Sequence, residues 1–436
     1  MMLMRLLVHP FRLPIHQAHP FARAVPEHMQ TIPDLLRSHS ILPNTRSSAL
    51  FHAIYDVREE RAQCVAPAPL ARKYSVEQQN AQTIVQVHNR FTGQRTFWNA
   101  QRTAKPQSFA AAAALEDPTV SKGCDFCSWQ ELTATDGWGR VENEHCVTAS
   151  NLFKITRHHG LVLFKHHNPL ECSRAQMGSL LDASQRWVHQ THASSPHDAL
   201  WPLLMWNSGP RSGASQFHPH AQILMNHTPL PDLARRRAAA AAFSARSGGL
   251  DETGSLAPAE DGASRGYDGR ATAAFERACA DAHAALGLRR VLRIRDADAK
   301  GKEDIAWVYH EVQPLKDCDT VVLGTSIQSP AFIALLHCAL RTFVDGCGVM
   351  TFNASVTGLT LTPSDEQDAE LGCVVARLVS RGKVTSAASD YGALEVFTGA
   401  SIGHTSPWRI AAKLDEEAQR QGLLLDGSVA VQTVIA

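Results

Sequence analysis

The segment Ser212–Gln222 has the sequence SGASQFHPHAQ and lies between two short apolar runs, residues 201–206 and 223–225. Both runs are typical of strands, and small residues such as those before the histidines favour a turn. Side chains alternate across a strand, so every second residue shares a face. On this pattern we expect three nitrogen-bearing side chains on one face, namely His218, His220 and Gln222. Their convergence indicates a site that breaks a phosphate ester.

His220 is the candidate nucleophile in this segment. An imidazole is partly unprotonated near neutral pH and can attack phosphorus to form a phosphoramidate. Gln222 can donate its amide to a phosphoryl or bridging oxygen, and Ser215 and the backbone amides of the Gly213 turn are further candidate donors. One histidine alone would more often be an ordinary strand residue, but the combined arrangement favours a site.

Composition limits the classes of protein to which this chain can belong. It has 436 residues, of which 44% are hydrophobic and 19% charged, as expected for a soluble globular protein of two or three structural units. The 42 basic and 42 acidic residues leave no net charge to attract nucleic acid or a membrane. No apolar run approaches the roughly 20 residues that span a bilayer. Ten scattered cysteines favour a reducing compartment, so we expect a cytoplasmic protein.

The chain divides into four parts by composition. Residues 1–50 form an irregular N-terminal arm or a targeting leader to an organelle, because the first carboxylate is Glu27 and arginines precede it. Residues 51–243 and 273–436 each mix strands and helices, which predicts an α+β fold. Residues 244–272 are rich in Ser, Gly, Ala and Asp and predict a flexible insertion.

Periodicity predicts the main elements of both mixed parts. Strands are expected at residues 83–88, 93–98, 161–164, 290–294, 305–313, 320–324 and 349–361. Helices are expected at residues 177–192, 275–286 and 332–343. A further helix is expected to begin after Thr362-Pro363-Ser364-Asp365 and to bury Leu371, Val374, Val375 and Leu378.

Cys124 and Cys127 form a second constellation, a Cys-x-x-Cys turn. Two thiolates at this spacing can hold one Zn²⁺, which needs two more ligands. His218 is one candidate, and His166 or His167, after the strand at residues 161–164, is the other. The alternative is a pair of unrelated reduced cysteines or a redox pair.

These motifs resemble the histidine-triad superfamily, in the branch of galactose-1-phosphate uridylyltransferase and the dinucleoside polyphosphate phosphorylases. The matching residues have the family's order and spacing: Asn207, Gly213, Ser215, His218, His220 and Gln222. The resemblance implies that His220 forms a covalent nucleotidyl-histidine, that Gln222 stabilises it, and that Asn207 and Ser215 contact phosphates. It also implies a structural Zn²⁺ held by Cys124, Cys127, His167 and His218, with His166 as the alternative to His167.

The resemblance further implies two histidine-triad-like units, each an antiparallel sheet with packed helices. The second unit, residues 273–436, lacks a His-x-His motif and is expected to complete the pocket. There, Arg381 and Lys383 could reach an anionic substrate, although a solvated helix end is the more common role for such a pair. A homodimer is a further expectation from the family.

The sequence therefore predicts a nucleotidyltransferase or phosphorylase that works by double displacement. Its donor is a nucleoside diphosphate sugar or a dinucleoside polyphosphate, and its acceptor is phosphate or a sugar phosphate. Two alternatives remain open at this point. One is a hydrolase, in which water resolves the same intermediate, and the other is a nucleotide-binding protein without turnover.

Overall fold

The computed structural model describes residues 45–74, 76–99, 101, 121–247, 269–295, 303–364, 373–384 and 389–427. Nearly all of the predicted N-terminal arm and most of the predicted insertion lie outside the described residues. The helices on either side of the insertion extend into its predicted range, since α7 (Pro231–Ser247) ends later and α8 (Gly269–Ala284) begins earlier than expected.

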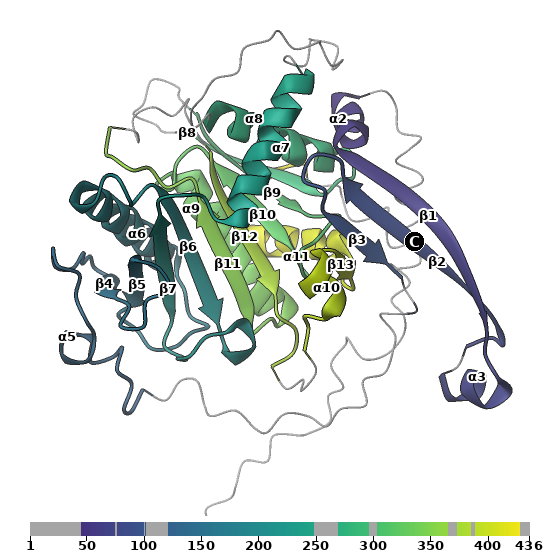
Figure 1. The fold of residues 1–436 in the computed structure, drawn as a ribbon, viewed down its shortest axis with the longest axis horizontal. Helices are drawn as coiled ribbons and strands as arrows, with labels where there is room; N and C mark the ends of the chain where they lie inside the picture. The colour runs from purple at the N-terminus through teal and green to yellow at the C-terminus, as the bar shows by residue number, and fades with distance from the viewer. Residues whose placement is uncertain are drawn as a thin grey trace, which may run out of the picture.

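A ten-stranded antiparallel sheet forms the centre of the molecule, in the order β14-β8-β9-β10-β12-β11-β6-β7-β5-β4 (Figure 1). Its strands are β4 (Cys146–Ser150), β5 (His158–Phe164), β6 (Trp201–Ser208), β7 (His220–Asn226), β8 (Arg289–Arg295), β9 (Glu303–His310), β10 (Thr320–Gly324), β11 (Phe352–Thr357), β12 (Val374–Ser380) and β14 (Leu425–Asp426). The pairing of β6 with β11 joins strands from both predicted units into this one sheet. The α+β class is confirmed, while the division into two units stays a prediction.

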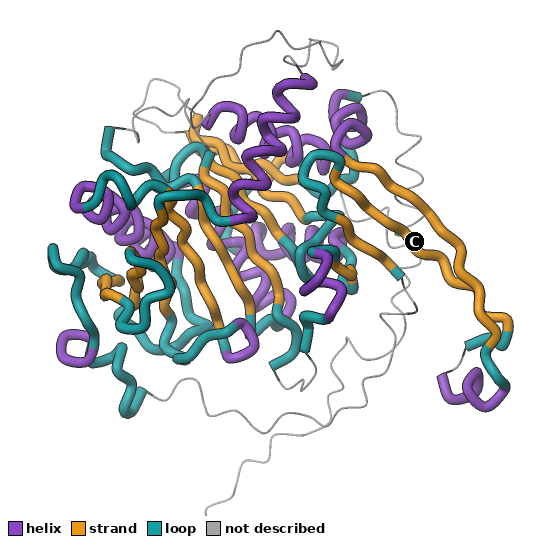
Figure 2. Tube along the Cα trace, in the orientation of Figure 1, coloured by secondary structure: helices purple, strands orange, loops and turns teal. Residues whose placement is uncertain are grey.

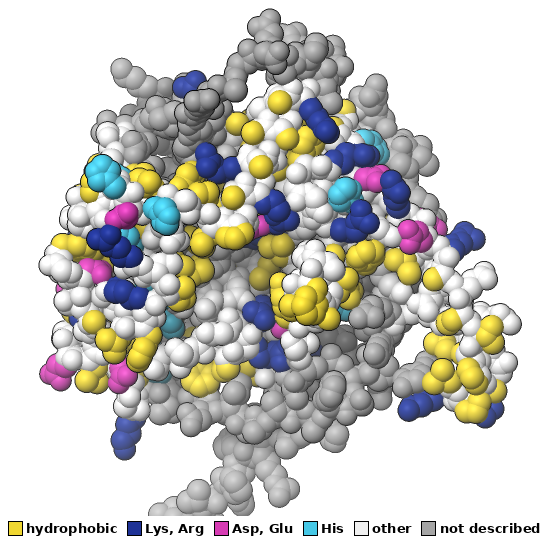
Figure 3. Space-filling model, in the orientation of Figure 1, with side chains coloured by type: hydrophobic (Ala, Val, Ile, Leu, Met, Phe, Trp, Pro, Cys, Tyr) yellow, Lys and Arg dark blue, Asp and Glu magenta, His cyan; other side chains and the backbone are white. Residues whose placement is uncertain are grey.

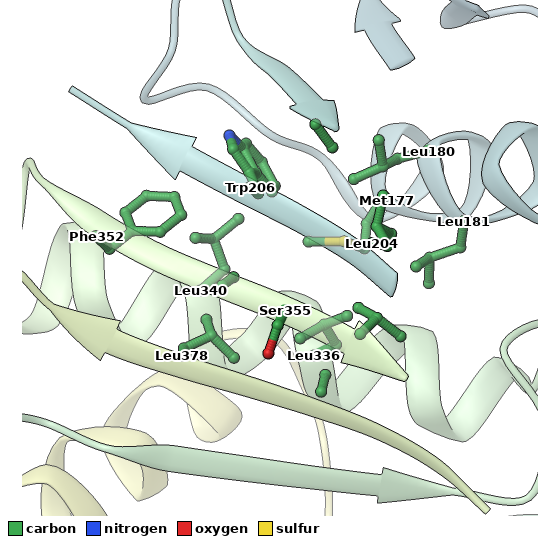
Figure 4. A pocket seen from close by; sticks show the side chains of 14 residues that line it. Met177, Leu180, Leu181, Leu204, Trp206, Leu336, Leu340, Phe352, Ser355 and Leu378 are labelled. Atoms are coloured by element: carbon green, nitrogen blue, oxygen red, sulfur yellow. The ribbon is translucent and has the colours of Figure 1, made fainter. Parts of the chain in front are cut away.

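One face of this sheet is covered by α6 (Arg174–Ser194), α9 (Pro330–Arg341) and α11 (Pro407–Arg420). α6 begins with a capping box. The Ser173 hydroxyl accepts a hydrogen bond from the backbone N–H of Gln176, and the Gln176 side-chain oxygen accepts one from the backbone N–H of Ser173. The η2 turn (Thr342–Gly346) follows α9. Figure 4 shows apolar side chains of α6 and α9 that meet those of β6, β11 and β12. This face therefore holds the larger hydrophobic core.

The opposite face is covered at its two ends by different segments. At the β9 and β10 end lie α2 (Arg46–Ile54), α7 and α8, which share a second core with the small sheet. The small sheet has the order β1-β2-β3-β13. Its strands are β1 (Tyr55–Val65), β2 (Gln79–Asn89), β3 (Arg95–Trp98) and β13 (Ser401–Gly403). β13 pairs with β3 in parallel, so residues near both ends of the described chain lie together.

Three further features complete the fold. The β1–β2 ribbon extends away from the main sheet and carries α3 (Ala68–Tyr74) at its end (Figures 1 and 2). At the β4 and β5 end of the main sheet, a loop that contains α5 (Trp129–Leu132) packs against Leu161 and Leu163 through Phe126 and Trp129. α10 (Ala393–Thr398) lies beside β13.

The prediction of a helix after Thr362 is wrong for the residues that the structure describes, from 373 onward. Residues 374–380 form β12, which pairs with β10 and β11 inside the main sheet. Its buried residues alternate along the strand, with Val374, Ala376 and Leu378 in the larger core and Val375 packed on the other side. A strand that is apolar on both faces has the same composition as a short buried helix, which is why periodicity misassigned it.

Charged side chains of both signs are interspersed on the surface in the view of Figure 3. Within the part of the chain that the structure describes, no helix is long and apolar enough to cross a bilayer.

Candidate active site and metal centre

His220 and Gln222 share one face of β7, as predicted, but His218 does not belong to that strand. β7 begins at His220, and His218 lies in the bend before it. The register pairs His220 with Leu163 and Gln222 with Leu161, so both polar side chains lie on the face opposite the larger core. Ala221 and Ile223 point into that core and anchor the strand.

The imidazole of His220 is held in one tautomer. Its Nδ1–H donates to the backbone carbonyl of His218 at 2.8 Å, which leaves Nε2 without a proton. No other described residue hydrogen-bonds to Nε2. Only 4% of the residue is exposed, and burial lowers the pKa of His220, although the bond to the His218 carbonyl opposes this shift. The neutral, nucleophilic form is thus the stable one at neutral pH.

Cys124, Cys127, His167 and His218 come together as a candidate metal centre, in which all four ligand atoms lie within 4.8 Å of one another. The Cys127 Sγ lies 3.2 Å from His167 Nδ1 and 3.4 Å from His218 Nδ1, and the Cys124 Sγ lies 3.6 Å from His218 Nδ1. The usual Zn–S and Zn–N lengths place ligand atoms about 3.3–3.8 Å apart around a tetrahedral ion. The geometry therefore fits Zn²⁺.

The chemistry of the donors also fits a cation. Burial and the neighbouring Cys124 raise the pKa of Cys127 to about 11, so the two thiolates need a positive charge between them. Burial lowers the pKa of His218 to about 4, which keeps the ring in the neutral form that binds metals. The Nε2–H of His218 donates to the Phe164 carbonyl at 2.7 Å and aims Nδ1 at the thiols.

The structure distinguishes between the two histidines that the sequence left open. His166 Nε2 donates to the Glu171 carbonyl at 2.9 Å, and His166 Nδ1 accepts from the Gln176 amide at 3.2 Å. Both ring nitrogens are thus used outside the cluster. His167, by contrast, places Nδ1 beside Cys127. His167 is the ligand that the geometry supports.

Phe126, between the two cysteines, links the metal centre to His220. Its ring centroid lies 5.7 Å from that of His218 and 5.1 Å from that of His220, in edge-to-face arrangements. The His218 backbone carbonyl also holds His220, as described above. A disturbance of the cysteine loop would therefore reach His220 through both a ring contact and a hydrogen bond.

Asn207 and the Gly213 turn lie next to each other at the end of β6. Gly213 has a φ of 89°, and a Cβ placed on it would lie 4.0 Å from the Asn207 Nδ2. The turn's backbone amides are not free as expected, because those of Gly213 and Ala214 donate to the carbonyls of Pro210 and Gly209. Ser215 is exposed in the following bend, and its role in phosphate binding stays a prediction.

Three residues that the sequence did not assign to the site contact it. His159, on β5, lies 2.9 Å from the Gln222 Oε1 through its Nε2. Asn353, on β11, donates to the Asn207 Oδ1 at 2.6 Å. Phe126 is the third. Strand pairing brings His159 and Asn353 there, and a single sequence carries no signal for that register, whereas Phe126 lies within the Cys-x-x-Cys turn itself.

The prediction that Arg381 lies at a solvated helix end is wrong. Arg381 follows a strand and makes a bidentate ion pair with Asp390 at 2.7 and 3.0 Å, and it donates to the Asn353 Oδ1 at 2.7 Å. Burial raises the pKa of Asp390, but the bond to Arg381 outweighs it, so the pKa is lowered. Lys383, two residues further on, is exposed.

Comparisons with known proteins concern the fold. No family model and no curated protein match this sequence. The chain is similar in structure to an ADP-glucose phosphorylase from Arabidopsis thaliana with bound ADP-glucose, with a TM-score of 0.51 and 14% identity over 76% of this chain and 99% of that chain. A GalT-like protein from Arabidopsis thaliana matches with a TM-score of 0.46 and 16% identity, over 69% and 94% of the two chains. A uridylyltransferase matches with a TM-score of 0.46 and 12% identity, over 76% and 98%.

The likeness to the ADP-glucose phosphorylase shows that the two chains share a fold. That fold is the one expected from the resemblance of residues 207–222 to the histidine-triad superfamily.

Proposed function

We propose that this protein is a nucleotidyltransferase or phosphorylase in which His220 carries the nucleotidyl group. The observation that carries this proposal is the hydrogen bond from His220 Nδ1–H to the His218 carbonyl, which leaves an unprotonated Nε2. The Gln222 and Asn207 amides on the neighbouring strands supply donors for phosphoryl oxygens. One solved structure that shares this fold is an ADP-glucose phosphorylase with bound ADP-glucose, which favours a nucleotide substrate.

The reaction has two displacements. In the first, the Nε2 lone pair of His220 forms a bond to the α-phosphorus of the donor, and the bridging P–O bond breaks, so that its electron pair leaves with a phosphorylated product. The positive charge on the ring is stabilised by the Nδ1–H bond to the His218 carbonyl. In the second, an oxygen of phosphate or a sugar phosphate attacks phosphorus, and the P–N bond breaks. Two inversions give net retention at phosphorus.

Zinc would have a structural role in this scheme. Cys124, Cys127, His167 and His218 would hold it, and a bound Zn²⁺ would neutralise the two thiolates and fix the bend before β7. His218 would hold the metal through its side chain, and its backbone carbonyl orients His220. The two histidines of His-Pro-His therefore have different roles.

The proposal is tested by the dependence of donor consumption on an acceptor. ADP-glucose, UDP-glucose and diadenosine tetraphosphate are each incubated with the protein, with and without phosphate or hexose 1-phosphate. We expect turnover that requires the acceptor and parallel lines in double-reciprocal plots, as ping-pong kinetics demand. Acceptor-independent release of nucleotide would instead indicate a hydrolase. Binding of nucleotides without any turnover would indicate an inactive binding protein.

A further inference from the structure

Two amide side chains of the proposed site, Gln222 and Asn207, use their oxygens within the protein. Gln222 Oε1 lies 2.9 Å from His159 Nε2, and Asn207 Oδ1 accepts from Asn353 Nδ2 at 2.6 Å. No described residue accepts a hydrogen bond from the NH2 group of either amide. Both residues are half-buried and lie on the face of the main sheet opposite the larger core.

The orientation of the Gln222 amide follows from a group that can only donate. The backbone N–H of Ile155 donates to His159 Nδ1 at 3.0 Å, so the proton of this neutral ring lies on Nε2. His159 is 1% exposed, and burial lowers its pKa, which favours the neutral ring. The Nε2–H then requires an acceptor, and Gln222 Oε1 provides it. The Asn151 amide nitrogen lies 3.0 Å from the same Nε2, but as a donor it cannot accept that proton.

The orientation of the Asn207 amide follows from a second such group. The Arg381 guanidinium has only donors and gives one to Asn353 Oδ1 at 2.7 Å. The Asn353 NH2 group must therefore face the other way, where it donates to Asn207 Oδ1 and, at 3.0 Å, to the backbone carbonyl of Ser212. Asp390 holds the guanidinium in place through its bidentate pair. Because its oxygen is used by Asn353, Asn207 has only its N–H groups available to a ligand.

The sheet register brings each orienting residue to its amide. Asn353 is directly opposite Asn207 where β11 pairs with β6. His159 and Gln222 are diagonal neighbours across β5 and β7, since Leu161 is the direct partner of Gln222. Asn353 and Arg381 come from the second half of the chain, so that half reaches the site through an orienting contact.

We infer that His159 and Asn353, the latter fixed by Arg381, are positioning residues that lock the Gln222 and Asn207 amides with both NH2 groups directed at the phosphoryl oxygens of the substrate. This inference deepens the proposed function and rests on it for the identity of the ligand. An amide free to rotate would present its oxygen to an anion half of the time. The hydrogen bonds from His159 and Asn353 exclude the orientation in which an amide oxygen would face the anion, before substrate binds.

The sharpest test is Asn353→Asp, compared with Asn353→Ala. A carboxylate at this position can only accept, so it turns the Asn207 amide around and directs the Asn207 oxygen at the substrate. We expect kcat/KM to fall roughly 10-fold to 100-fold in Asn353→Ala, on the scale of a misplaced contact, and further in Asn353→Asp. In an Asn207→Ala background, neither change should matter by more than about 3-fold. Ser355→Ala, two residues along the same strand face, is the matched control and should behave as wild type.

The His159 lock is tested separately, in case the Asn353 variants fail to fold. His159→Leu should lower kcat/KM roughly 10-fold or more, whereas His159→Gln, which can still donate to Gln222, should retain more activity. In a Gln222→Ala background, the two variants should be equal. Effects of Asn353 and His159 variants that persist undiminished without Asn207 and Gln222 would overturn the inference and indicate a structural role.

Binding of inorganic pyrophosphate, measured by calorimetry, separates this inference from the proposed function. If wild type binds pyrophosphate, Asn353→Asp does not, and no nucleotide is turned over, the function fails while the orientation stands. If nucleotide is turned over but the effects of the Asn353 and His159 variants add to those of Asn207→Ala and Gln222→Ala, the inferred amide orientation is overturned and the proposed function stands. Absence of pyrophosphate binding by wild type would overturn the inference, because the amides would then not face an anion site.

Discussion

Gly160 on β5 is a position where one added methyl group should destabilise the whole site scaffold. A Cβ there would lie 2.6 Å from Cε2 and 2.7 Å from Nε1 of the Trp187 ring, which is about 0.8 Å inside ordinary contact distance. The ring cannot move easily, because Trp187 is 1% exposed and its Nε1–H donates to Asp136 at 2.7 Å. Overpacking of this kind costs about 1–3 kcal/mol, and the fixed ring places Gly160→Ala at the upper end.

The assay is urea unfolding followed by tryptophan fluorescence. Gly160→Ala should lower the free energy of unfolding, and adding Trp187→Phe should recover part of the loss by making room for the methyl group. Gly178→Ala in α6 is the matched control, because a Cβ there would lie 3.8 Å from the nearest atom of Ile333. That variant should gain up to about 1 kcal/mol from helix propensity. Equal stability of Gly160→Ala and wild type would refute the packing argument.

Two further predictions concern acid stability and the metal. Burial, followed by repulsion from Arg290, lowers the pKa of His310 to about 3, so the unfolded chain binds this proton more readily below pH 6.5. The free energy of unfolding should therefore fall by about 1.4 kcal/mol per pH unit between about pH 6 and pH 4 because of His310 alone. His310→Gln should show a smaller dependence of this free energy on pH, and an unchanged dependence would contradict the prediction. Wild type should contain one zinc per chain by mass spectrometry, and Cys127→Ser should lose the zinc and melt at a lower temperature. Cys64→Ser, at an exposed cysteine of β1, is the control and should keep the zinc and the melting temperature of wild type. Wild type purified without zinc would exclude the metal centre.

The sequence predicted the parts of the fold and site that depend on local chemistry. The alternation of His220 and Gln222 and the Cys124–Cys127 pair were sufficient to indicate the two candidate sites. They were sufficient because strand alternation and ligand chemistry act over a few residues. The turn before the motif was predicted, but its amides proved to be used within the turn itself.

Contacts set by sheet register could not be predicted in the same way. Asn353 lies 146 positions from Asn207 and reaches it only because β11 pairs with β6. β12 was misassigned as a helix because Val375 and Val379 on its half-buried face are as apolar as Val374 on its buried face, so hydrophobicity does not alternate along the strand. The choice of His167 over His166 required knowing that Glu171 and Gln176 occupy the His166 ring.

The central claim is that His220 becomes covalently nucleotidylated, and radiolabelling tests it most directly. Wild type incubated with α-³²P-labelled ADP-glucose, UDP-glucose or diadenosine tetraphosphate, without an acceptor, should retain label on the protein. The bond should be labile in acid and stable in base, as expected for a phosphoramidate, and added phosphate or hexose 1-phosphate should discharge it. His220→Asn should carry no label. Label that persists in His220→Asn, or turnover of a donor without any label on wild type, would contradict the account.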